Sequence, residues 1–517
     1  MSEPTLIQEQ RAILRRLREA TAQHTQITTA AEAQWQGVQR VCEELVKASK
    51  KALQCVPTSP PTDSLSADPA EAFRHSASQA IQIAKAFKGL LFQFWQQIVM
   101  LRMHSKAFRV FFREDDSMVA SSEEEEWVTD PSTLLEYIFF IIRDSNAIDD
   151  IDPQVRIEAI IVGGIYPEIQ ERAAALAQAM AEAQFWYDRL QEQAAADYHR
   201  AVQEQILASY RQWQDSLSRY DRPTPFPWQD PRWQDWAMST QAEPNLLRLG
   251  EMQRLAEQQQ LEMPALLAFP ASRSLLFKTA AASRATAARA VQSLLLRLLA
   301  SLPPGKLRFT FIDPVGLGQN AAPFMHLADY DEQLITGKAW SEPQHIEQRL
   351  ADLTEHMENV IQQYLRNQYA TIEDYNAQAG EIAEAYRVLV VFDFPVNFNE
   401  TAARRLVSIA QNGPRCGVYA VILMDTDKVG DVRANNYSPL QPLLADLEQN
   451  AEVIAWQDDR WVWQDEDLKE CTLELDTPPE AELFNRIVTA VGEAAKASSK
   501  VEVPFERIAP PREQWWR

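Results

Sequence analysis

The chain has 517 residues, with 50 Lys and Arg against 73 Asp and Glu, so its formal net charge is −23. This length predicts two to four domains. A hydrophobic fraction of 46% argues against a disordered chain, and the negative charge argues against nonspecific nucleic-acid binding by the whole surface. Only 14 residues are glycine. None stands five residues before a Gly-Lys pair, so no intact G-x-x-x-x-G-K-S/T phosphate loop exists, which argues against an ordinary NTPase site.

The cysteine spacing and the apolar stretches indicate whether the protein holds a metal and whether it is secreted or spans a membrane. Cys42, Cys55, Cys416 and Cys471 show no C-x-x-C spacing, which indicates reduced thiols rather than a disulfide framework or a zinc site. The first ten residues lack the basic and apolar regions of a signal peptide, and the stretch Gly89–Leu101 is too short to span a bilayer. The sequence therefore predicts a cytoplasmic protein with no membrane span and no metal site.

The N-terminal part is predicted to be helical. Residues 1–56 are rich in Gln, Ala and Glu and form a first helical segment, and residues 57–69 form a Pro/Ser linker. A second helical region covers residues 70–220. Within it, the acidic loop 114–126 is either solvated or a docking site for a basic partner.

The clearest periodic pattern lies in residues 167–220. Between Ala173 and Ala194 the apolar side chains alternate by three and four, which is a coiled-coil seam. The next seam positions step by four, a stutter that locally unwinds a supercoil: Tyr198, Val202, Ile206 and Tyr210. We predict one helix over 167–220, roughly 80 Å long at 1.5 Å per residue. Its seam packs either within the chain, as an antiparallel hairpin, or against another protein as an intermolecular coiled coil.

Residues 221–264 are predicted to be a Pro/Trp-rich linker followed by a helix. Four prolines end the preceding helix, and Trp228, Trp233 and Trp236 stand close together. These indoles form either an aromatic platform for a ligand or anchors that pin the linker to a neighbouring surface.

After residue 264, short apolar runs alternate with helical patterns. The expected strands are 274–278, 307–313, 387–394 and 418–424, and the expected helices are 283–300, 342–368 and 399–411. This alternation predicts an α/β domain over 265–440, with a parallel sheet covered on both faces. Residues 441–517 are predicted to be a small α/β tail, with a hairpin at 451–464 and a strand and helix at 471–498.

The first strand-to-helix turn of such a domain is where an NTPase holds phosphates. Here the two glycine positions of the phosphate loop are taken by Lys278 and Ser283, and the lysine position by Arg284. Ala285 replaces the magnesium-binding hydroxyl, although Thr286 follows it. Without the glycines the loop cannot readily wrap a phosphate. The segment is therefore either a remnant of a nucleotide site or a plain strand-to-helix turn.

Two carboxylates follow neighbouring strands. The run Val388–Phe392 followed by Asp393 has the form of a Walker B strand, whose Asp supports a magnesium ion. The catalytic Glu expected next is Phe394, so no polar residue stands ready to orient an attacking water. Asp313 is a second carboxylate predicted at the same sheet edge.

Residues 303–327 and 387–425 resemble the FtsK/SpoIIIE family of DNA-translocating and secretion ATPases, which includes the type VII secretion ATPases. The resemblance rests on the strand that ends in Ile312-Asp313-Pro314, on the later Walker B strand and its helix, and on the strand entry Arg415-Cys416-Gly417-Val418. It covers residues 265–440. The family's Walker A is degenerate here, and the polar sensor expected after the last strand is replaced by Met424-Asp425-Thr426-Asp427.

The resemblance implies a RecA-like, P-loop-type domain with degenerate motifs that assembles with copies of itself or with a partner ATPase module. It implies ATP and magnesium as cofactors only if the degenerate site still binds them, or in another module, and DNA as a partner only through the assembled motor. Arg415 would either act on a neighbouring subunit's nucleotide or form a structural ion pair. Residues 501–516 resemble a linker into a further ATPase module, so the chain is expected to be part of a larger or split ATPase.

Three functions are consistent with these features. The first is a non-catalytic assembly or regulatory portion of an ATP-driven DNA or polypeptide translocase that recruits a partner through its coiled coil. The second is a weakly active ATP-binding motor domain that uses Arg284 and Asp393. The third is a coiled-coil scaffold that needs no nucleotide.

Overall fold

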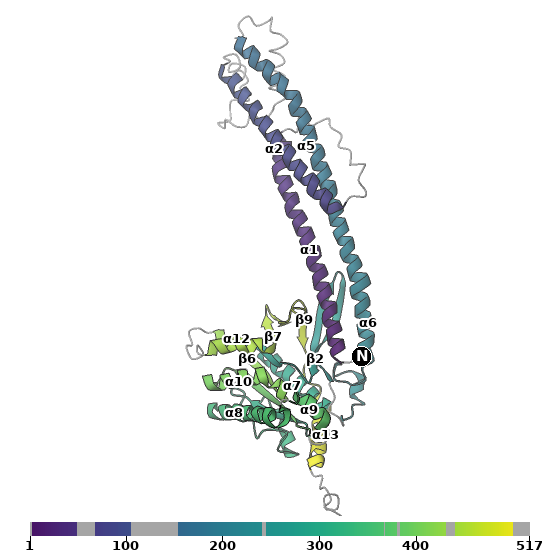
Figure 1. Cartoon of the computed structure of the whole chain (residues 1–517), viewed down its shortest axis with the longest axis vertical. Coiled ribbons are helices and arrows are strands. Elements are labelled where there is room, and N and C mark those ends of the chain that lie inside the picture. Colours follow the sequence, from purple (N-terminus) through teal and green to yellow (C-terminus); the bar gives the residue numbers. More distant parts are fainter. Residues whose placement is uncertain are drawn as a thin grey trace, which may run out of the picture. The chain divides into compact units, whose positions relative to one another are not determined.

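The computed structural model describes residues 3–48, 68–104, 153–239, 245–366, 368–379, 383–430 and 440–499 (Figure 1). The acidic loop, most of the Pro/Ser linker and the segment 501–516 lie outside these residues. The chain divides into two compact units: a helical unit of residues 19–201, and an α/β unit that combines residues 1–18 with 202–517. None of the described helices is long and apolar enough to cross a bilayer.

The described part of the helical unit consists of α1 (Glu3–Ala48) from residue 19 onward, α2 (Pro69–His104) and α5 (Pro153–Arg200). The ring of Tyr187 on α5 lies 5.7 Å from Trp35 on α1 and 5.6 Å from Phe73 on α2. The seam residues Ala173 and Leu176 are buried in the same apolar core. In this structure the seam thus packs on helices of its own chain, which is the intramolecular alternative.

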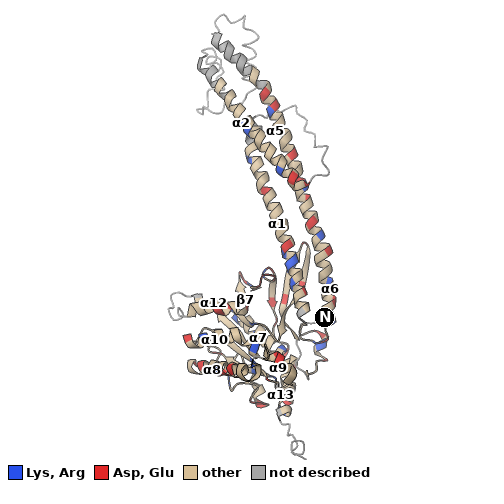
Figure 2. Ribbon diagram, viewed as in Figure 1, with Lys and Arg blue, Asp and Glu red and all other residues tan. Residues whose placement is uncertain are grey.

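The predicted start of the long helix at residue 167 is wrong. Helix α5 begins at Pro153, and Pro167 lies inside it. Proline removes one backbone hydrogen bond from a helix interior. Packing of an apolar face provides most helical stability in proteins, and Ile169 and Ala173 are buried directly after the proline. In the coloured part of α5 in Figure 2, acidic and basic residues are interspersed rather than gathered in a basic stripe.

The stutter coincides with a change of helix type. Residues Ala201–Ile206 form a π-helical turn, and α6 follows at Leu207–Ser218. A π-helix has more residues per turn than an α-helix, so successive steps of four keep Val202 and Ile206 on the buried side.

The α/β unit contains a nine-stranded sheet in the order β2-β1-β9-β8-β7-β3-β6-β5-β4. Its strands are β1 (Asn245–Ala256), β2 (Gln259–Phe269), β3 (Ser274–Thr279), β4 (Leu307–Ile312), β5 (Tyr386–Phe394), β6 (Val418–Asp425), β7 (Ala451–Gln457), β8 (Arg460–Trp463) and β9 (Thr472–Leu475). Strands β7-β3-β6-β5-β4 are parallel, and those from β2 to β7 are antiparallel. The sheet is therefore mixed, and the expected parallel sheet is only one half of it.

Two groups of helices pack on this sheet. Helix α7 (Arg284–Ser301) packs against β1, β3 and β6, and α13 (Ala481–Ser499) packs on α7. Helices α8 (Pro343–Asn359), α10 (Glu400–Asn412) and α12 (Gln441–Gln449) pack side by side (Figure 1). The shorter elements are a second π-helical segment (Val360–Leu365), α9 (Ile372–Ala379), α11 (Thr426–Gly430) and the 3₁₀ turns Pro231–Trp233, Ala322–Asp329 and Pro414–Cys416.

The helix predicted within 221–264 is wrong, because β1 and β2 form an antiparallel hairpin there. Strand β1 is rich in Leu, Met, Gln and Arg, which favour helix, and it has no β-branched residue. Tertiary pairing overrides that propensity: β1 pairs with both β2 and β9, and a side chain at Gly250 would collide with the carbonyl of Glu474 on β9.

A buried arginine anchors the Pro/Trp-rich segment. Arg297 on α7 donates to the carbonyl oxygens of Thr224 (2.8 Å) and Phe226 (2.7 Å) and pairs with Asp476 (2.8 Å). Its guanidinium lies 4.1 Å from the ring of Trp228, whose Nε1 donates to Ser293 Oγ (2.9 Å). The indole is used inside the fold, as the anchor interpretation expects. Burial lowers the pKa of Arg297 to about 9, so it stays charged at neutral pH.

Arg297→Met should lower the free energy of unfolding by about 3 kcal/mol, because it removes the donor of the Thr224 and Phe226 carbonyl groups and leaves Asp476 with Arg248 as its remaining partner. Urea unfolding followed by tryptophan fluorescence measures this. Arg404→Met is the matched control, because Arg404 pairs with Glu400 on the exposed face of α10 and should change stability by under about 0.5 kcal/mol. Equal effects of the two variants would contradict the anchoring role.

Candidate nucleotide site

The carboxyl ends of four parallel strands meet at one edge of the sheet. Thr279 ends β3, Asp425 ends β6, Asp393 lies near the end of β5, and Asp313 follows β4. Ligands of open α/β sheets bind at this edge, so it is where the sequence places the remnant of a nucleotide site.

The turn between β3 and α7 uses its own backbone donors. The Ala280 N–H donates to Ser283 Oγ (3.0 Å), and the N–H groups of Ser283 and Arg284 both donate to the Ala280 carbonyl (3.1 Å each). The Ala281 N–H donates to Asp427 Oδ2 (2.8 Å), on α11. A phosphate loop works by presenting such N–H groups to an anion. Here a carboxylate of the same chain accepts from the Ala281 N–H, and acceptors within the turn accept from those of Ala280, Ser283 and Arg284.

Arg284 joins the two acids at the strand ends. Its Nε lies 3.2 Å from Asp393 Oδ1, and its Nη2 donates to Asp425 Oδ2. Both carboxylates are almost fully buried, with Asp393 5% and Asp425 1% exposed, whereas the Arg284 side chain is 33% exposed. Burial raises the pKa of Asp393, and the Arg284 guanidinium opposes this rise. Lys428 Nζ also lies 3.6 Å from Asp425 Oδ2, so Arg284 and Lys428 together supply the positive charge at this edge.

The backbone at Asp393 is in the left-handed region, with φ of 55°. A non-glycine residue there is uncommon and carries strain. The pairing register of β5 with β6 shifts between Val391 and Phe394, on either side of this residue. This break in the strand sets the position from which the Asp393 carboxylate meets Arg284.

The other predicted residues do not join this cluster. Lys278 Nζ pairs with Glu448 Oε1 on α12 (2.8 Å). Asp313 is buried and accepts hydrogen bonds from the N–H groups of Gly316 (3.0 Å), Gly318 (3.0 Å) and Asn320 (3.2 Å), so it closes its own loop. Ala285 and Thr286 are exposed on the first turn of α7.

Arg415 lies at the opposite edge of the sheet. It is exposed in the turn Pro414–Cys416, directly before β6 begins. It is therefore not part of the Arg284 cluster of its own chain, and both of its predicted roles stay open.

Asp425 and Asp427 were not predicted as site residues, and appeared only as replacements for a polar sensor after the last strand. Asp425 ends β6 and Asp427 follows two positions later on α11. This place directly after a predicted strand was the available signal, because parallel strands bring their carboxyl ends together.

The residues at this edge do not fit a magnesium–nucleotide complex. The N–H groups of Ala280, Ala281, Ser283 and Arg284 donate within the chain, and the two acids are paired with a guanidinium. Across the part of the chain that the structure describes, no group of three or more His, Cys, Asp or Glu is arranged to hold a metal ion. No step of ATP hydrolysis can be derived from this arrangement.

No family model and no curated protein matches the chain. Solved structures similar to it include EssC (ATPases 2 and 3) from Geobacillus thermodenitrificans, with a TM-score of 0.38, 15% identity and 51% of each chain covered. Another is EccC (ATPases 2 and 3) from Thermomonospora curvata in complex with a signal sequence peptide, with a TM-score of 0.35, 13% identity, and 50% of this chain and 49% of that one covered. A third is the pCW3 conjugation coupling protein TcpA with ATPgS, with a TM-score of 0.32, 13% identity, and 51% and 73% covered. The chain spans about half the length of the first two. At these TM-scores the similarities carry no argument about activity.

Arg284→Met should destabilise the protein by roughly 1–3 kcal/mol, because it removes the cation that pairs with the buried Asp393 and leaves Asp425 with Lys428 alone (3.6 Å). The loss should grow with pH. A raised pKa means that the folded chain holds the Asp393 proton more tightly than the unfolded chain. The free energy of unfolding therefore falls as the pH rises from the unfolded-state pKa of Asp393 to its folded-state pKa. Without Arg284 the folded-state pKa rises further, so this pH interval extends upward.

Urea midpoints at about pH 5 and about pH 8 test this sign. The difference between wild type and Arg284→Met should be larger at the higher pH. Arg404→Met, on the exposed face of α10, should show no such trend. A deficit independent of pH would contradict the charge-compensating role of Arg284.

Proposed function

We propose that this protein is a non-catalytic assembly or regulatory module of a cytoplasmic, FtsK/SpoIIIE-like ATP-driven translocase. The observation that carries the proposal is the position of Arg284, which bridges Asp393 and Asp425 while Asp427 binds the N–H of Ala281. The chain thus fills the site from within. ATP hydrolysis, and movement of DNA or polypeptide, would belong to another module.

The arrangement of the α/β unit supports a RecA-like origin. A strand-to-helix turn after β3 and an acid near the end of β5 lie at one edge of a parallel half-sheet, where a nucleotide site of this class is built. The fold at this edge is kept, and the chemistry of the site is replaced by an internal ion pair.

The partners in this proposal are copies of this chain or an active ATPase module, with DNA reached only through the assembled motor. Arg415 would serve such an assembly, because it is exposed at the edge away from the Arg284 cluster. The helical unit would supply a surface for a protein partner.

Titration calorimetry of Mg-ATP into the full chain tests the proposal. We expect no saturable binding at Mg-ATP concentrations up to about 1 mM. This corresponds to a binding free energy less favourable than about −4 kcal/mol. Asp393→Ala and the control Asp197→Ala, an exposed residue of α5, should both leave this result unchanged. Micromolar binding that Asp393→Ala abolishes and Asp197→Ala preserves would establish the weakly active motor instead.

The scaffold function is favoured by one specific observation, an exposed aromatic side chain on the helical unit. Phe92 on α2 is 63% exposed, and large exposed apolar groups often mark contact sites. If the chain assembles through this face, Phe92→Ser should lower the molar mass measured by light scattering.

Leu255→Ser is the matched control, because Leu255 is 62% exposed but lies on β1. A fall in mass for Phe92→Ser alone would support assembly through α2. An unchanged mass, or an equal fall for both variants, would argue against the scaffold function.

A further inference from the structure

The antiparallel half of the sheet must curl. Strands β2 and β3 are five steps apart in the sheet order β2-β1-β9-β8-β7-β3, which is about 24 Å in a flat sheet. Only residues 270–273 join the end of β2 to the start of β3, and five Cα–Cα steps reach at most about 18 Å. The two strands are therefore drawn together, and the sheet bends around the space between them.

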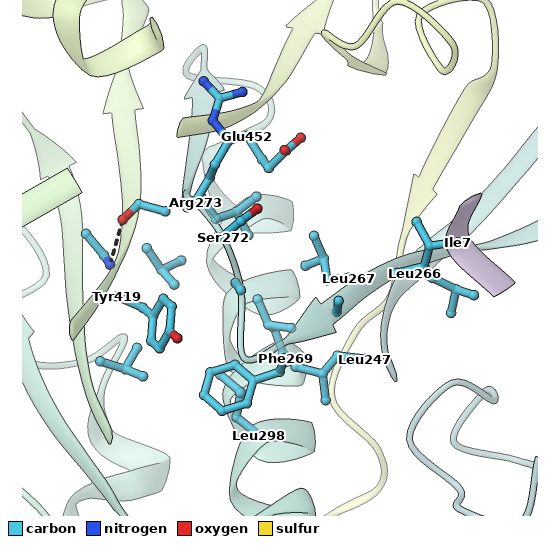
Figure 3. Close-up of a pocket in the computed structure, with 18 of the residues that line it drawn as sticks. Ile7, Leu247, Leu266, Leu267, Phe269, Ser272, Arg273, Leu298, Tyr419 and Glu452 are labelled. Carbon is cyan, nitrogen blue, oxygen red and sulfur yellow. Dashed lines mark hydrogen bonds between the residues drawn. The ribbon is translucent and has the colours of Figure 1, made fainter. Parts of the chain in front are cut away.

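A cavity of ≈ 380 Å³ occupies this bend (Figure 3). Its walls are mostly apolar and come from β1, β2, β3 and α7, with Leu247, Leu266, Phe269, Leu275, Leu294 and Leu298 among them. Small-molecule sites typically have volumes of about 300–1,000 Å³, apolar walls and a few placed polar groups. This cavity meets both the volume and the wall chemistry.

The polar groups at the β3 and β6 walls of the cavity are already satisfied by the protein. Ser274 Oγ accepts from the Ala420 N–H (3.1 Å; dashed in Figure 3), and the Tyr419 hydroxyl donates to Glu373 Oε1 (3.0 Å). A buried ligand therefore gains little from hydrogen bonds at these walls. The interior suits an aliphatic chain.

Charge gathers at one end of the cavity. Arg273 and Glu452 lie there, away from Phe269 and Leu298 (Figure 3). Glu452 Oε2 accepts from Trp463 Nε1 (3.1 Å), and Arg11, which also lines the cavity, pairs with Asp465 (2.6 Å). Arg273 is exposed and donates to the Gln449 carbonyl. Within the described residues it has no carboxylate partner, so it can receive an anion.

We propose that this cavity binds a medium-chain aliphatic carboxylate, with the chain between Phe269 and Leu298 and the carboxylate on Arg273. The apolar walls provide affinity, and the guanidinium selects the acidic head group. This site lies in the curled half of the sheet, and the proposal does not depend on whether the Arg284 edge binds a nucleotide.

Calorimetry of the full chain with decanoate, octanoate and decylamine tests the proposal. Each buried CH₂ contributes about fourfold in affinity, so decanoate, with two more CH₂ groups, should bind about fifteenfold more tightly than octanoate. Decylamine has the same chain and the opposite charge, and it should bind at least about tenfold more weakly than decanoate. Equal binding of decanoate and decylamine, or no saturable binding of decanoate, would overturn the proposal.

Three variants assign the site. Arg273→Gln should weaken decanoate about tenfold and remove the preference over decylamine, whereas Arg404→Gln on α10 should change neither. Leu267→Trp, at a half-buried wall position, should fill the cavity and abolish binding of both ligands.

Thermal melting monitored by circular dichroism shows whether each variant is folded. A folded Leu267→Trp that binds decanoate as wild type does would place the ligand elsewhere and overturn the assignment. If Leu267→Trp does not fold, the comparison of Arg273→Gln with Arg404→Gln tests the site by itself. Equal affinities of these two variants for decanoate would then overturn the assignment.

Discussion

The buried guanidinium of Arg297 ties together the parts of the α/β unit that lie far apart in the chain. It links α7 to the carbonyl groups of Thr224 and Phe226 and, through Asp476, to the end of β9. Asp476 also pairs with Arg248 on β1 (3.1 Å). Because α7 is held in this way, its first turn is fixed at the strand ends, where Arg284 meets two acids, and its later turns form a wall of the apolar cavity.

The parallel half of the fold could be predicted from the sequence, and the antiparallel half only in part. Strands β3 to β6 are short apolar runs that alternate with amphipathic helices, a pattern with few alternatives. The hairpin of β7 and β8 could also be predicted, from the alternation of apolar and polar residues in 451–464. Strand β1 is composed of residues that favour helix, and only its pairing with β2 and β9 makes it a strand. That pairing depends on contacts between positions more than 200 residues apart, such as Gly250 and Leu475, which local patterns do not report.

The candidate site shows a similar division. The sequence identified the positions of Arg284 and Asp393 by motif spacing, and the structure brings these two together. Asp425 and Asp427 were not identified as partners, because no motif requires acids after β6. Lys278 and Asp313 were placed by the motif but contact Glu448 and the loop after β4 instead. Motif spacing thus predicts the backbone position of a residue. The partner of its side chain depends on which charged residues lie at the ends of the neighbouring strands.

The hydrogen bond from Ala281 to Asp427 has a consequence for any attempt to build a phosphate site at this turn. The two residues are 146 positions apart, so the competing acid lies on a different segment from the turn between β3 and α7. Restoring glycine, lysine and a hydroxyl to the loop would leave Asp427 beside it, and removing Asp427 would leave a loop that cannot wrap a phosphate. Neither step alone is expected to create a phosphate site. A design that seeks nucleotide binding at this turn therefore has to change the turn and α11 together.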